Sequence, residues 1–85
     1  MTPYQRGNRD GLLALAAWAR QAANTEGREV ERCAAIELGP VNETQRRAAQ
    51  NISTNAVRRM AVYNAVAREA ERMAQALPCD PEETP

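Results

Sequence analysis

The chain of 85 residues contains no histidine, lysine or phenylalanine, and its only serine is Ser53. These absences exclude a histidine-based catalytic triad, a histidine metal site, a Schiff-base lysine and a lysine-containing phosphate loop. The two cysteines, Cys33 and Cys79, lie 46 residues apart (79 − 33), so one chain cannot form a C-x-x-C redox pair or a zinc knuckle. We therefore expect no enzymatic activity, no metal site and no cofactor.

Large aliphatic residues are scarce as well. Leucine, isoleucine and valine together number 12 of 85 residues, whereas alanine alone numbers 17. A share below ~20% makes a self-sufficient globular core doubtful. No run approaches the ~18 apolar residues of a membrane span, and no basic region followed by an apolar run opens the chain. We expect a cytoplasmic, alanine-rich helical protein that needs a partner or a second copy of itself.

The first 38 residues have helical patterning. A hydroxyl at Thr2, the proline Pro3 and an amide at Gln5 predict a helix that begins at Pro3. Its apolar face is expected at Leu12, Leu15, Trp18 and Ala22, with Ala16, Ala19 and Ala23 beside it. The pattern loosens around residues 24–27, where Thr25 offers a cap for a second helix. That helix would bury Val30, Cys33, Ala34 and Leu38. The segment is thus either one bent helix or two.

A boundary follows at Gly39 and Pro40, because glycine suits a left-handed residue after a helix and proline cannot continue one. Asn42 stands three residues before Gln45, a capping-box pattern that predicts the start of another helix. The chain is therefore predicted to be all-α, forming either a helical hairpin or a three-helix bundle with a long C-terminal helix. Residues 1–77 form the domain, and the acidic, proline-rich residues 78–85 form a disordered tail.

The long C-terminal helix is expected over residues 43–77 and should continue through the poor helix formers at 51–55. The alternative is a kink or a restart there, with Ser53 or Thr54 as the cap. The apolar positions of this helix recur in steps of three and four over about four heptads, which is typical of a helix packed lengthwise on another. These positions are Ala49, Ile52, Ala56, Tyr63, Val66, Ala70, Met73 and Leu77. We expect a homo-oligomer that self-associates through Ile52, Ala56, Tyr63, Val66, Ala70 and Met73.

Charge is unevenly distributed although the formal net charge is zero. Residues 26–43 contain five glutamates and two arginines, whereas residues 44–68 contain five arginines and no acid. A turn at Gly39 would lay the acidic segment along the basic one. Arginine binds carboxylates and phosphates in bidentate fashion, and glutamates can imitate nucleic-acid phosphates. The candidate partner-binding residues are therefore Arg46, Arg47, Arg58, Arg59, Glu26, Glu29 and Glu37.

Two further patterns concern the arrangement of side chains. On an ideal helix Arg47 and Arg58 lie on nearly the same side, with Arg72 about forty degrees round. The aromatic residues Trp18 and Tyr63 both fall on apolar faces, so we expect them to pack together.

Two segments resemble proteins of bacteriophages. The opening YQRGNRDGL, followed by alanines and a tryptophan, resembles the start of many small phage and prophage proteins over residues 4–23. The segments MAV at 60–62 and AVA at 65–67 are similar to the last helix of hairpin phage proteins that sequester cyclic-nucleotide immune signals. The predicted helix here runs ten residues further, so no ligand residue is carried over. The resemblance implies a small phage accessory protein. Such proteins include anti-CRISPR proteins and other anti-defence factors, which occupy a surface of a host protein or complex.

We therefore expect a small non-enzymatic protein that acts by stoichiometric binding to a host macromolecule in the bacterial cytoplasm. The most specific form of this predicted function is that of an anti-CRISPR or other anti-defence inhibitor. Two alternatives remain open. One is an arginine-rich helical nucleic-acid binder, which the zero net charge disfavours. The other is a helical oligomer that holds a small anionic nucleotide between its subunits. A purely structural component of a phage is a further alternative.

Overall fold

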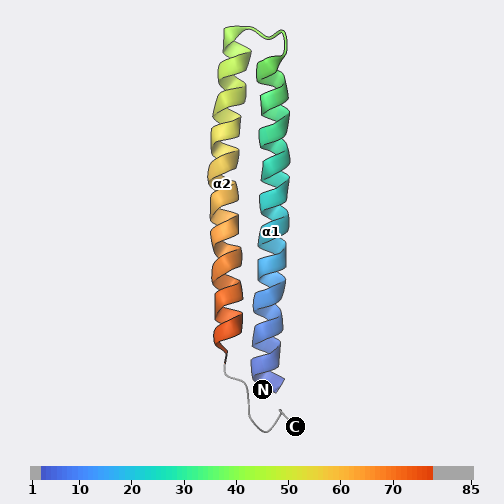
Figure 1. Ribbon diagram of the computed structural model, residues 1–85, viewed down its shortest axis with the longest axis vertical. Helices are drawn as coiled ribbons and strands as arrows, with labels where there is room; N and C mark the ends of the chain where they lie inside the picture. The colour runs from blue at the N-terminus through green and yellow to red at the C-terminus, as the bar shows by residue number, and fades with distance from the viewer. Residues whose placement is uncertain (1–2, 78–85) are drawn as a thin grey trace.

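The computed structural model describes residues 3–77 and folds them into two long antiparallel helices. Helix α1 spans Pro3–Leu38 and helix α2 spans Glu43–Ala76. The helices lie side by side along their whole length, with the connection at one end and the N-terminal end of α1 beside the end of α2 (Figure 1). The predicted start at Pro3 is confirmed. Its predicted cap, Thr2, and the predicted tail at 78–85 lie outside the described residues.

Helix α1 is continuous through residues 24–27, where the sequence allowed either one bent helix or two helices. Thr25 does not cap a new helix, because its hydroxyl donates to the carbonyl of Gln21 at 3.1 Å within α1. Thr54 likewise donates to the carbonyl of Gln50 at 2.9 Å, and α2 continues through residues 51–55 as predicted. A hydroxyl that bonds back four residues leaves the helix intact. The helical hairpin is therefore confirmed, and the described residues form no third helix.

The connection ends α1 and starts α2 with local hydrogen bonds. The Gly39 N–H donates to the Ile36 carbonyl at 3.1 Å, and the Val41 N–H donates to the Gly39 carbonyl at 2.9 Å. The second bond closes a three-residue turn around Pro40, whose fixed φ suits it. The prediction of a left-handed glycine here is wrong, because no glycine among the described residues has a positive φ.

The predicted capping box at the start of α2 is confirmed. The Gln45 N–H donates to Asn42 Oδ1 at 2.8 Å, and the Asn42 N–H donates to Gln45 Oε1 at 3.0 Å. Two backbone donors at the helix start are thereby satisfied by side chains of the same turn.

The interface between the helices consists of small side chains. The buried residues are Ala16, Ala19, Ala23, Cys33, Ala49, Ala56, Ala67, Ala70 and Ala74. Small residues allow two helix backbones to approach closely, and larger residues are then displaced to the flanks of the interface. This is why Ile52 and Met73, predicted in the seam, are 41% and 45% exposed. The predicted burial of Ala34 and Leu38 is also wrong, since both are exposed and Leu38 is 90% exposed.

The hairpin is a thin rod of 66 × 15 × 14 Å with a radius of gyration of 19.4 Å. A compact domain of this length would have a radius of gyration of about 12 Å. With only two helices side by side, each helix has one covered face and leaves most of its circumference exposed. None of the described helices is long and apolar enough to cross a membrane.

Candidate interaction surfaces

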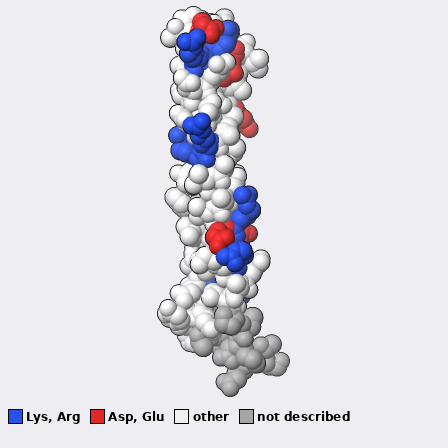
Figure 2. Space-filling model, turned by 90° about the vertical axis from the view of Figure 1, so that its left-hand side faces the viewer, with Lys and Arg blue, Asp and Glu red and all other residues white. Residues whose placement is uncertain are grey.

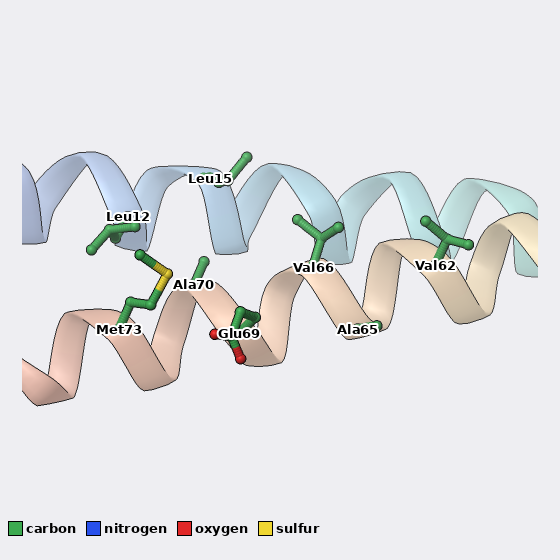
Figure 3. A pocket seen from close by; sticks show the side chains of 8 residues that line it. All are labelled: Leu12, Leu15, Val62, Ala65, Val66, Glu69, Ala70 and Met73. Carbon is green, nitrogen blue, oxygen red and sulfur yellow. The ribbon is translucent and has the colours of Figure 1, made fainter.

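An apolar groove runs between the helices near the open end of the hairpin (Figure 3). Its volume is about 410 Å³, and Leu12 and Val66 on its floor pack against the buried alanines. Figure 3 shows Met73 reaching toward Leu12, while the carboxylate of Glu69 points away from α1. The lining residues are Leu12, Leu15, Val62, Ala65, Val66, Glu69, Ala70 and Met73. Glu69 is the one charged residue in this set, so the groove fits an apolar group rather than an anion.

The groove lies on the same side of the hairpin as a second hollow. A second hollow, of about 300 Å³, lies near the connection and contains Ile36 and Ile52. Leu15 and Ile36 are three heptads apart on α1, and Ile52 and Val66 are two heptads apart on α2. Residues a whole number of heptads apart keep the same orientation toward a helix that packs lengthwise. Both hollows therefore belong to the same side, which we call the groove side.

The groove side is interrupted near its middle by a cluster of ion pairs, which we call the polar belt. It consists of Glu26, Glu29, Arg32 and Arg59. Arg59 Nη2 lies 3.1 Å from Glu26 Oε2 across the helices, and Arg32 forms a bidentate pair with Glu29 within α1. The belt contains two acids and two bases, so it is neutral overall.

Hydrogen bonding dominates the electrostatics of the belt. The hydrogen bond from Arg32 lowers the pKa of Glu29, with a smaller contribution from the charge of Arg59. The hydrogen bond to Glu26 raises the pKa of Arg59. At the open end, the hydrogen bond from Arg72 lowers the pKa of Glu69. The lowered pKa values of Glu29 and Glu69 favour their ionised forms, which is the opposite of what a general acid requires.

Trp18 and Tyr63 meet across the helices, as predicted. Their ring centroids are 5.7 Å apart and their planes are nearly perpendicular, the edge-to-face arrangement that aromatic pairs favour. Tyr63 is half-buried, whereas Trp18 remains 57% exposed. Trp18 lies three residues after Leu15, and residues at this spacing are neighbours on the surface of a helix. The apolar part of the groove side therefore extends from the groove to Trp18.

A row of basic residues, Arg47, Arg58 and Arg72, lies on the outer side of α2. Each is two residues, about 200°, from a buried alanine, and therefore faces away from α1. Figure 2 faces this side and shows basic groups at several heights along the rod, with uncharged surface between them. We call these three residues the outer arginine row. The rough alignment predicted for them agrees with this placement.

The three members of the outer arginine row differ in whether they form ion pairs with carboxylates. Arg47 lies 3.9 Å from Glu43, and Arg72 forms a bidentate pair with Glu69. Arg58 is exposed and has no carboxylate partner among residues 3–77. Its guanidinium is therefore the member of the row whose donors are available to another molecule.

The other candidate partner-binding residues are distributed around the rod. Arg46 pairs with Glu43 at 3.6 Å, and the polar belt contains Glu26, Glu29 and Arg59. Glu37 has no ion pair within the described part of the chain. The predicted contact between the acidic segment of α1 and the basic segment of α2 takes the form of the Glu26 to Arg59 pair. The candidates therefore do not converge on one site.

The candidate self-association residues divide between the interior and the surface. Ala56 and Ala70 are buried between α1 and α2, and Tyr63 and Val66 are half-buried there. Ile52 and Met73 are exposed on the groove side. Val62 also lines the groove and is 60% exposed, and it was not among the predicted residues. A sequence signal existed, since Val62 lies four residues before Val66 and therefore on the same face of the helix.

The side opposite the groove side is marked by an ion pair that sequence analysis also missed. Arg20 of α1 donates to Glu71 of α2 across the helices. Val57 lies two heptads before Glu71 and is 44% exposed, so it belongs to this opposite side. The hairpin therefore has two distinguishable sides, of which the groove side is the more apolar.

The described residues contain no cluster of three or more cysteine and carboxylate side chains that could hold a metal ion. Cys33 is a free, buried thiol in the helix interface. Comparison with known proteins finds no matching family model, no matching curated protein and no matching solved structure.

Proposed function

We propose that the protein acts by stoichiometric binding to a macromolecule of a bacterial host rather than by catalysis. The described residues bury no polar or charged side chain. The carboxylate at the groove, Glu69, is paired with Arg72 and has a lowered pKa. A cleft that performed acid or base chemistry would instead gather titratable groups with opposed pKa shifts.

The proposal rests mainly on the exposed guanidinium of Arg58. It is exposed, faces away from α1 and has no carboxylate partner among residues 3–77. A guanidinium offers five donors in a planar fork that matches a carboxylate or phosphate, and arginine is enriched among residues that dominate binding energy. We propose that Arg58 contacts an acidic group of the partner, with Arg47 on the same side of α2 about 16 Å along the helix. Glu26 and Glu29 are occupied in the polar belt, which disfavours phosphate mimicry by glutamates.

The finer proposal is that the host target is a defence complex and that binding inhibits it, as anti-CRISPR proteins do. Its support is the resemblance of residues 4–23 to the start of small phage proteins, together with the two long helices whose surfaces make up most of residues 3–77. In this proposal the site of action is the bacterial cytoplasm.

Affinity capture tests the proposal. Tagged protein is incubated with a nuclease-treated bacterial lysate that contains defence systems, and recovered proteins are identified by mass spectrometry. We expect one stoichiometric host complex, recovered at least tenfold less with Arg58→Glu. Arg28→Glu is the matched control, because Arg28 is exposed on α1 and also lacks an ion pair among the described residues. Equal losses for the two variants, or no host complex, would contradict the proposal.

The same capture without nuclease examines the nucleic-acid alternative. Direct binding would show an affinity that falls steeply as salt rises. The small-nucleotide alternative lacks support from the groove, whose lining residues include no arginine. A rise in melting temperature on adding a nucleotide would favour that alternative over ours.

A further inference from the structure

The groove side exposes large apolar side chains, whereas the residues buried between the two helices are small. The interface between α1 and α2 buries eight alanines and one cysteine, and no leucine, isoleucine or valine falls in the buried class among residues 3–77. Leu15, Trp18, Val62 and Met73 all remain more than two-fifths exposed. A buried alanine removes only one methyl group from water, so this interface contributes little hydrophobic stabilisation for 75 described residues.

We propose that a second copy of the chain covers the groove side, so that two hairpins form a four-helix bundle. The self-association surface is then the flank of the hairpin, with Leu15, Trp18, Val62 and Met73 as its anchors. It is not the seam of Ala56 and Ala70, because α1 already occupies that seam. This inference goes beyond the proposed function and does not depend on it.

The area of the groove side matches what a stable dimer needs. Helix α2 has 34 residues, so it is about 51 Å long, and the hairpin is 15 Å wide. Covering one side from end to end buries roughly 750 Å² per copy, close to the ~800 Å² per partner of a standard stable interface. A docked segment of one or two helical turns would leave most of this side exposed.

The charges on the groove side also suit a second copy. The polar belt is neutral, with its two glutamates and two arginines already paired, and the formal net charge of the chain is zero. Two copies therefore do not repel each other, and the belt presents both signs of charge to its own copy. Glu69 at the groove is likewise paired with Arg72. The outer arginine row faces away from α1 and stays accessible in this dimer.

Light scattering coupled to size exclusion tests the proposal on the full chain. We expect a mass of about twice 9.4 kDa for the natural sequence. Val62→Glu should reduce the mass to that of one chain, because it places a charge in the covered surface. Val57→Glu is the matched control on the opposite side of the same helix and should leave the dimer intact. Far-UV circular dichroism checks that both variants remain helical.

Trp18 provides an independent readout, because it is the only tryptophan and lies in the proposed interface. Dilution from about 100 μM to about 0.1 μM brackets micromolar dissociation constants. Over this range the tryptophan emission should shift to longer wavelength together with the fall in mass. A single-chain mass at every concentration would overturn the proposal. A dimer that survives Val62→Glu, or that dissociates without a change in Trp18 emission, would overturn it as well.

Discussion

Each buried alanine presents one methyl group to the other helix, and this sets how closely α1 and α2 approach. Ala56 is fully buried, as are Ala19 and Ala67. A packed interface has no room for additional methylenes, so a larger side chain must either adopt a strained rotamer or separate the helices. Side-chain size therefore determines which residues can be buried between α1 and α2, and hydrophobicity alone does not identify them.

Replacing Ala56 by leucine tests this dependence on size. We expect Ala56→Leu to lower the free energy of unfolding by about 1 to 3 kcal/mol, because it overpacks the interface. Ala61→Leu is the matched control, since Ala61 is exposed on the same helix and its replacement should change stability by less than about 0.5 kcal/mol. Urea denaturation followed by circular dichroism, at equal protein concentrations, measures both. Equal effects would mean that the alanines do not limit the approach of the helices.

Only part of the candidate surface was predictable at the residue scale. The pairing of Trp18 with Tyr63 followed from apolar patterning on each helix. The pairing of Arg20 with Glu71 did not, because it depends on the register between the helices, which periodicity within one helix leaves undetermined. For the same reason the sequence named Arg59 and Glu26 as partner-binding candidates, whereas the fold pairs them with each other.

At the scale of the helices, local signals predicted the ends well. The capping pattern of Asn42 and Gln45 and the stop at Pro40 depend only on neighbouring residues, and both appear in the structure. The seam of α2 was predicted less well. Ile52, Val66 and Met73 were predicted in the seam because they are large and apolar. The residues that follow Val66 and Met73, which are Ala67 and Ala74, are the ones that are buried. A shift of one residue turns a helix by about 100°, so the predicted face was rotated toward the groove side.

The capping box offers a test of a single helix end. We expect Asn42→Ala to lower the free energy of unfolding by about 1 kcal/mol, because the backbone N–H of Gln45 loses its side-chain acceptor, Asn42 Oδ1. The same change at Asn51, which is exposed inside α2, should be neutral or slightly stabilising, since alanine is the better helix former. Thermal unfolding followed by circular dichroism compares the two variants. A loss of the same size at both positions would contradict a specific role of the cap.

The whole molecule is a rod, and its shape connects the fold to its proposed dimer. Within residues 3–77, each helix covers one face of the other, and no third layer completes a core. Large apolar side chains such as Leu15, Trp18 and Met73 therefore remain exposed on the flanks, where the proposed second copy would cover them. The composition predicted a partner without saying where it would bind, and the packing of α1 on α2 identifies the flank on which our proposal places it.

Small-angle scattering distinguishes the ways in which two such rods can join. The radius of gyration of one chain is 19.4 Å, and pairing along the groove side at about 10 Å separation raises it only to about 20 Å while the mass doubles. Joining the rods end to end would nearly double the radius of gyration, since the chain is 66 Å long. We expect the natural chain at high concentration and the Val62→Glu variant to have nearly equal radii but a twofold difference in forward scattering. A radius that rises steeply with mass would contradict side-by-side pairing, because only an end contact lengthens the rod.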